Sequence, residues 1–168
     1  MTIEFQLLYK NWRNICNNCV FWRKIMLIEV KYDNELLGII INGNYDKPGI
    51  SFFTPDDLSQ QVAYMNHPKG HEILPHVHNK VTREVHYTQE VLIIKTGKLR
   101  VDFYTNEKEY IESRVLSSGD IIVLVSGGHG FTVLENVEMY EIKQGPYTGE
   151  GDKTRFKGIA SGNLQVLG

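Results

Sequence analysis

Two histidines separated by one residue, His76 and His78, constrain the fold of this chain more than any other feature. Side chains alternate across a β-strand, so both imidazoles would leave one face of a strand, whereas on a helix they would point about 200° apart. Pro75 precedes the pair and disfavours a helix. Glu90 lies in a second strand-like run, which the sequence predicts to turn at Thr96–Lys98. If the two strands pair inside a barrel, two imidazoles and a carboxylate meet as potential ligands of a transition metal.

From residue 27 onward, short apolar or alternating runs are separated by turn residues. Leu36–Ile41 is almost wholly apolar and ends at a turn, and Ile121–Val125 has the pattern of a strand buried on both faces or nearly so. In residues 98–103, Leu99, Val101 and Phe103 alternate with charged side chains, which is typical of a half-buried strand. This pattern predicts an all-β sandwich or barrel with roughly eight to eleven strands.

Length and charge narrow the class of protein further. A chain of 168 residues is expected to form one domain with a core of its own. A formal net charge of −2 gives no electrostatic reason to expect a nucleic acid or an anionic membrane as partner. No apolar run is long enough to span a bilayer, and no secretory signal is recognisable. We therefore expect a soluble, cytoplasmic protein with a small-molecule partner.

Residues 1–25 differ from the rest of the chain. Both tryptophans and both cysteines lie there, and Met26 then opens a strand-like run. The sequence therefore suggests that Met26 is the natural first residue and that 1–25 is an upstream N-terminal extension from a mis-assigned start; the alternative is a short amphipathic helix packed on the barrel or on a partner. Cys16 and Cys19 form a lone CxxC, which without a second pair is weak evidence for a metal or redox site.

Five residues of the chain match a known motif. Gly70, His76, His78, Glu90 and Gly97 follow the first motif of the cupin superfamily, except that eleven residues instead of three or four separate His78 from Glu90. The chain thus resembles the cupins over about residues 66–143. A second cupin motif is degraded here: a valine replaces its proline and its histidine is displaced by one residue. The resemblance implies a double-stranded β-helix, or jelly-roll barrel, over residues 26–148, with residues 149–168 as a C-terminal tail.

The cupin resemblance also implies a set of metal ligands. These are His76, His78, Glu90 and His129, which would hold a divalent transition metal such as Fe, Mn, Zn or Ni. A polar barrel mouth without metal is the alternative, since some cupins have lost theirs.

Glu84 competes with Glu90 as the carboxylate ligand, because it lies nearer the usual cupin gap. The glycine that follows at the family's spacing favours Glu90, and if one strand covers residues 84–90, Glu84 and His86 share the face of Glu90. They are then candidate catalytic groups, because an imidazole titrates near neutral pH. A barrel histidine without a catalytic role is an equally good interpretation of His86.

Three functions fit such a protein. The first is a metal-dependent isomerase, epimerase or lyase acting on a sugar or sugar acid, a class also suggested by a faint resemblance to cupins of surface-polysaccharide gene clusters. The others are an Fe(II)-dependent dioxygenase and a non-catalytic protein that binds a small ligand. The resemblance also implies a homodimer, in which the apolar run Leu36–Ile41 would be the edge strand that pairs with the other copy. The C-terminal tail is predicted to be either a lid over the barrel mouth or a solvated segment.

Overall fold

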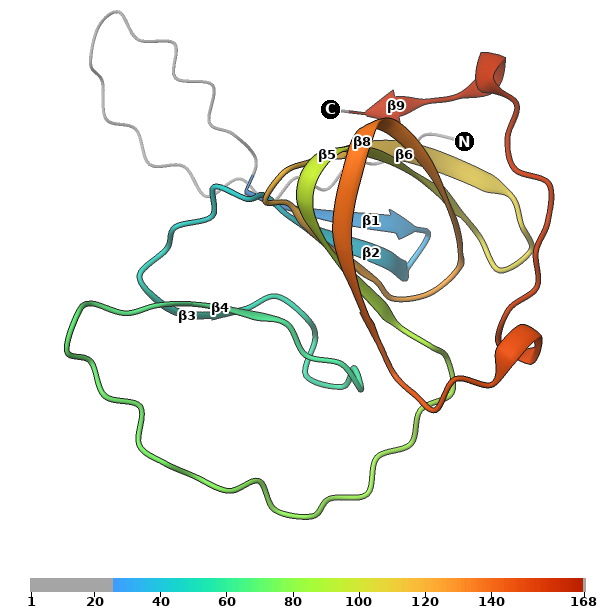
Figure 1. Ribbon diagram of the computed structural model, residues 1–168. Helices are drawn as coiled ribbons and strands as arrows, with labels where there is room; N and C mark the ends of the chain where they lie inside the picture. The colour runs from blue at the N-terminus through green and yellow to red at the C-terminus, as the bar shows by residue number, and fades with distance from the viewer. Residues whose placement is uncertain (1–25, 168) are drawn as a thin grey trace, which may run out of the picture.

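The computed structural model describes residues 26–167, which are almost entirely β-structure (Figure 1). The all-β prediction is confirmed, and the expectations for residues 1–25 lie outside the described residues. Nine strands and two short 3₁₀ turns make up this part of the chain: β1 (Leu27–Tyr32), β2 (Glu35–Ile41), β3 (Gly49–Phe52), β4 (Ala63–Asn66), β5 (Glu90–Tyr104), β6 (Tyr110–Ser117), β7 (Ile121–Leu124), β8 (Gly128–Lys143), η1 (Gly149–Asp152), η2 (Ser161–Asn163) and β9 (Val166–Leu167).

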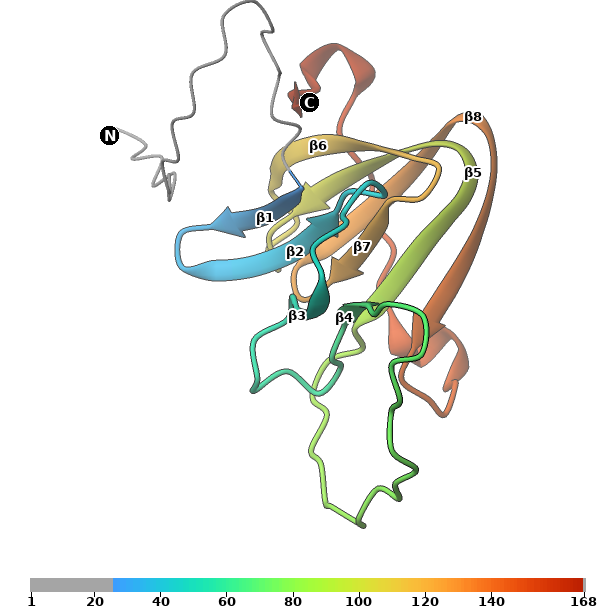
Figure 2. The ribbon, with the colours of Figure 1, turned by 90° about the vertical axis from the view of Figure 1, so that its left-hand side faces the viewer.

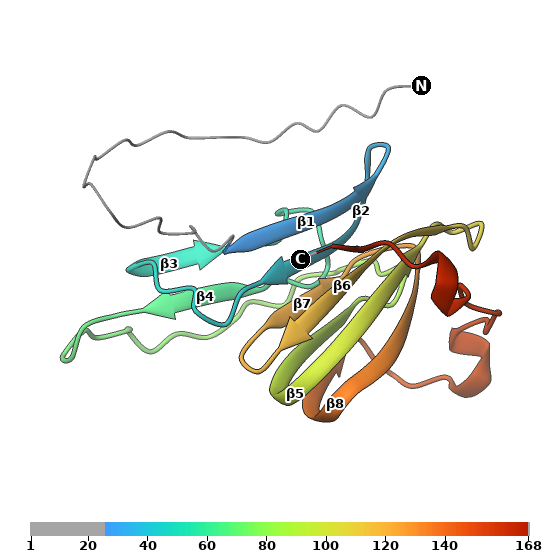
Figure 3. The same cartoon turned by 90° about the horizontal axis from the view of Figure 1, so that it is seen from above.

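Seven strands form one mixed sheet that curls into a half-barrel (Figure 3). The order is β1-β2-β7-β5-β6-β9, with β8 on the other side of β5. All pairings are antiparallel except that of β6 with β9. Strands β3 and β4 form a separate two-stranded sheet. The curled sheet is compatible with the expected β-barrel.

Strand β5 organises the sheet because its two halves have different neighbours. Its first residues, Glu90–Ile93, pair with β7, and its second half, Lys98–Tyr104, pairs with β6. Strand β8 follows it along nearly its whole length, with register shifts between Ile94 and Leu99. The predicted turn at Thr96–Lys98 is therefore wrong. Gly97, with φ of +82°, lies inside the strand at these bulges, where an extra residue bends a strand without ending it.

Apolar side chains cover both faces of the sheet. One cluster includes Leu92, Ile94, Leu99, Val101 and Phe103, so the predicted inward face of residues 99–103 is confirmed. The other face carries a second cluster, which residues from the β3–β4 region help to cover. Strand β2 contributes to both clusters and pairs with β1 on one side and β7 on the other. Since both of its edges are used, the proposal that Leu36–Ile41 is an edge strand of a dimer is wrong.

Residues 67–89 form no strand, contrary to the expectation for His76, His78 and residues 84–90. This segment leaves the barrel between β4 and β5 and projects away from it (Figure 2). Nearly all its side chains are exposed, and no neighbouring strand within residues 26–167 supplies the hydrogen bonds that would hold it in a ladder. No helix among residues 26–167 is long and apolar enough to cross a membrane.

Replacement of Gly97 by alanine tests the bend of β5. A Cβ atom there would overlap the backbone carbonyl of Asn136 and would force a side chain into the left-handed region. We expect Gly97→Ala to lower the free energy of unfolding by more than about 1 kcal/mol, measured by urea denaturation. Gly162→Ala is the control, because a Cβ atom at Gly162 meets open space. Equal stability of both variants would contradict this account of the bend.

Candidate functional site

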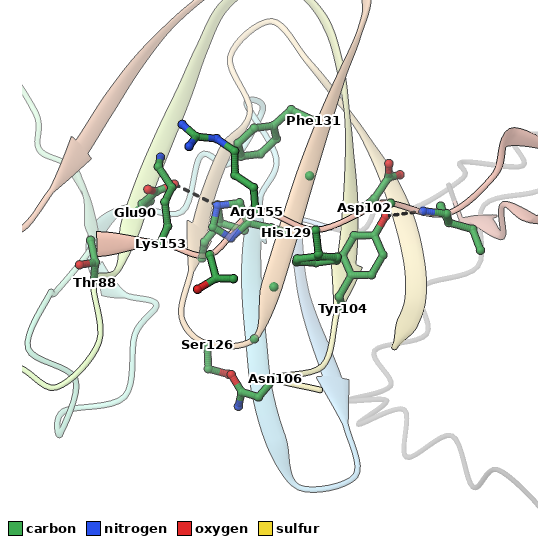
Figure 4. Close-up of a pocket in the computed structure, with 18 of the residues that line it drawn as sticks. Thr88, Glu90, Asp102, Tyr104, Asn106, Ser126, His129, Phe131, Lys153 and Arg155 are labelled. Carbon is green, nitrogen blue, oxygen red and sulfur yellow. Dashed lines mark hydrogen bonds and ion pairs between the residues drawn. The ribbon is translucent and has the colours of Figure 1, made fainter. Parts of the chain in front are cut away.

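A pocket of about 760 Å³ opens beside the start of β8. Residues of β5, the end of β7 and the first residues of β8 form one wall, and the C-terminal tail forms the other. Titratable and aromatic side chains from both walls face it (Figure 4). They include Glu90, Arg100, Asp102, Tyr104, His129, Phe131, Lys153, Arg155 and Phe156.

Glu90 and His129 form a side-chain pair that joins the starts of β5 and β8 at this pocket. Glu90 Oε2 lies 3.1 Å from His129 Nε2. In the strand ladder Glu90 is opposite Lys143, whereas His129 is opposite Phe103, at the other end of β5. Only the curl of the sheet brings the two side chains together. Glu90 is buried and His129 is partly buried, so water screens the pair weakly.

The surroundings of Glu90 favour its ionised form. The hydrogen bond from His129 lowers the pKa of the Glu90 carboxyl below its usual value, although burial acts in the opposite direction. The charges of His129, Lys143 and Lys153 lower it further, and Lys143 Nζ lies 3.9 Å from Glu90 Oε1. Glu90 is therefore a carboxylate at neutral pH, and it fixes the orientation of the His129 ring.

The C-terminal tail brings basic groups to the pocket. Lys153 and Arg155 both line the pocket, and the charge of Lys153 contributes to lowering the pKa of the Glu90 carboxyl (Figure 4). Arg100 also lines the pocket, but its guanidinium is engaged with both carboxylate oxygens of Asp102 and with Thr132 Oγ1. The tail thus adds positive charge to the pocket that contains the Glu90–His129 pair.

Aromatic contacts hold the tail in this position. The ring of Phe156 packs edge-to-face on Tyr104, with the centroids 5.0 Å apart, and the backbone N–H of Ile159 donates to the Tyr104 hydroxyl. Thr88 Oγ1 donates to Asp152 Oδ1 across the pocket. Residues 152–161 therefore line the pocket, as a lid would, while most of their side chains remain exposed.

The structure brings together two of the four predicted metal ligands, Glu90 and His129. His76 and His78 lie on the exposed 67–89 segment, where their rings contact each other with centroids 5.2 Å apart. Within residues 26–167, no three His, Cys, Asp or Glu side chains are grouped so that they could hold a metal ion. As placed, the residues do not fit a metal centre.

The two predicted catalytic groups, Glu84 and His86, are not among the residues that line the pocket. They form a loose pair on the exposed segment, with His86 Nε2 3.7 Å from Glu84 Oε1. The expectation that they share a strand face with Glu90 is wrong, because β5 begins at Glu90. Sequence reasoning missed Lys153 and Arg155, whose positions depend on the packing of Phe156 and not on a motif.

Replacement of Glu90 by glutamine should reduce stability in a pH-dependent way. Because the pKa of Glu90 is lower in the folded protein, the pair stabilises the fold at neutral pH. This contribution is lost as the pH falls from about 4.3, the usual glutamate value, through the lowered pKa. We expect Glu90→Gln to cost about 1.5–3 kcal/mol at pH 7 and less at pH 3, by urea denaturation. Glu138→Gln, at an exposed ion pair with Lys95, is the control. An equal loss at both pH values would refute this role of Glu90.

Comparisons with known proteins add no relative. No family model, no curated protein and no solved structure matches the chain. The resemblance to cupins therefore rests on the motif residues, and the geometry of the pocket is the basis for the function proposed below.

Proposed function

We propose that the protein is an enzyme that binds a small polar metabolite with an anionic group, such as a sugar derivative or sugar acid, and isomerises or epimerises it by proton transfer. The observation that carries this proposal is the Glu90–His129 hydrogen bond inside a pocket with basic residues. A volume of about 760 Å³ suits a ligand of this size. The cupin barrel suggested by the sequence would be a suitable scaffold, since such barrels commonly enclose ligand cavities.

His129 is the proposed general base. Its Nε2 is engaged by the Glu90 carboxylate, which leaves Nδ1 as the ring nitrogen for the substrate. A carboxylate partner stabilises the imidazolium that forms when the ring accepts a proton. In the proposed reaction, His129 removes a proton from a carbon next to a carbonyl group. In an isomerisation, the imidazolium returns a proton to the former carbonyl carbon on the same face, while the proton of the neighbouring hydroxyl group moves to the carbonyl oxygen. In an epimerisation, the enolate turns over in the pocket before the imidazolium returns the proton to the other face of the same carbon.

Lys153 and Arg155 are the proposed anion-binding groups. Removal of a proton next to a carbonyl places negative charge on the carbonyl oxygen, and nearby cations lower the energy of that state. They also attract a phosphate or carboxylate group of the substrate. Their place in the tail means that substrate binding depends on the contacts of Phe156 and Ile159 with Tyr104.

Solvent exchange tests this proposal with a panel of candidate substrates. The protein is incubated in D₂O with sugar phosphates, nucleotide sugars and sugar acids, and deuterium incorporation at carbon is followed by NMR. We expect exchange with at least one compound, a reduction of about 10²–10⁴-fold in His129→Ala, and no change in Glu138→Gln. Binding without exchange would favour the non-catalytic ligand-binding protein, and unchanged exchange in His129→Ala would exclude His129 as the base.

A metal-dependent reaction is the second candidate, favoured by the contact between the His76 and His78 rings. It requires these imidazoles to reach Glu90 and His129, so it needs a different position of the 67–89 segment. Metal content by mass spectrometry after loading with Fe(II), Mn, Zn or Ni tests it. Near-stoichiometric metal in the parent and in His71→Ala, with little in His76→Ala, is the expected result. No metal in the parent would remove this candidate.

A further inference from the structure

One edge of the main sheet has no partner among residues 26–167. Strand β8 pairs with β5 on one side only. Several of its apolar side chains are exposed, including Phe131, Val133 and Met139, and the exposed fraction of Val133 is 57%. An open strand of this length with exposed apolar side chains is a template for pairing with another strand.

A second segment has the side-chain pattern of a strand but belongs to no sheet among residues 26–167. In residues 69–88, here called the arm, every second position from 81 to 87 is apolar except Arg83: Val81, Val85 and Tyr87 would share one face of a strand, and the residues between are polar. The exposed fraction is 74% for Tyr87 and 88% for Val77. A segment of this length without regular structure is unusual in a compact domain, because ordering it is costly unless its apolar side chains are buried.

The charges of the arm and the edge are complementary. Strand β8 carries three glutamates and one lysine. The arm carries Lys69, Lys80 and Arg83 against two glutamates, together with four histidines. A positive arm beside a negative strand is favourable, and each glutamate of β8 also pairs with a lysine of its own sheet.

We propose that the arm of a second copy of this chain adds to the free edge of β8, and that the exchange is reciprocal in a two-fold symmetric dimer. A second copy is the occupant because the arm projects away from its own barrel (Figures 1 and 2). The residue that follows the arm is also held at the far end of its own β8, where the Gln89 N–H donates to the Gln144 side chain. A reciprocal exchange covers both arms and both edges at once, and it closes the assembly.

Light scattering on the full chain over a range of concentrations tests the dimer. The parent is expected to be a dimer. Val77→Lys in the arm and Val133→Lys in β8 should each weaken the dimer at least tenfold, because each places a charge where the other copy packs. Both side chains are exposed in a single copy, so folding is retained, as unfolding curves will show. The control is Ile50→Lys, at an apolar residue of β3 whose exposed fraction of 50% is close to the 57% of Val133. A monomeric parent, or equal dissociation of all three variants, would overturn the proposal.

Crosslinking distinguishes exchange between copies from folding back of the arm on its own β8. Val77→Cys and Val133→Cys are made separately in the full chain with Cys16→Ser and Cys19→Ser, mixed, and treated with a short bis-maleimide. Exchange predicts a crosslinked species that contains one copy of each variant, and Val115→Cys on β6 in place of Val133→Cys should abolish it. A crosslink that forms only within one chain, in the double variant, would overturn exchange. Neither result depends on catalysis, so the proposed function is tested separately.

Discussion

The bend in β5 is the constraint on which the rest of the structure depends. A straight strand of fifteen residues would keep the same neighbours throughout, but β5 pairs with β7 before the bend and with β6 after it. Strand β8 follows the bend, and the sheet curls around the cluster that contains Leu92, Leu99 and Phe103. The curl also brings the start of β8 to the start of β5. The same bend therefore both encloses the core and brings Glu90 and His129 into contact.

Buried polar groups on the other face of β5 are satisfied by one another. Asp102 accepts two hydrogen bonds from Arg100 and one from Ser113. Tyr110 contacts Ser113 Oγ and accepts from the Gln165 N–H, and the Ser113 N–H donates to the Gln165 carbonyl, next to the short strand β9. Because desolvated charges are costly without partners, this network favours one position of the chain end against β6. The same surface of β5 presents Tyr104 to Phe156.

Local patterns in the sequence predicted what depends on near neighbours. The alternation in residues 98–103 and the apolar run Ile121–Val125 both identified strands correctly, because the pattern of apolar and polar side chains shows whether one or both faces of a strand are buried. The predictions failed where the role of a residue or strand depends on which strands lie next to it in the sheet. Gly97 looks like a turn residue, but the continuous ladder with β8 makes it a bulge. The apolar run Leu36–Ile41 looked like an edge strand, but two neighbours make it central.

The candidate site was predictable in part for the same reason. Glu90 and His129 were identified from a motif, and the structure places them in contact, although their joint role as metal ligands remains a prediction. His76 and His78 have the spacing of a strand, yet spacing alone does not provide a strand to pair with. Lys153 and Arg155 could not be found by periodicity, because a tail without regular spacing positions them through the contact of one aromatic ring.

The position of the tail has a consequence for when the protein becomes competent to bind a ligand. Strands β1 to β8 end at Lys143, so all strands of the main sheet except β9, and both members of the ion pair, are synthesised before the tail. The basic wall of the pocket comes from residues 152–161 and can dock only afterwards. A protease that cut behind β8 would remove the basic wall of the pocket together with the Gln165 partners of Ser113 and Tyr110.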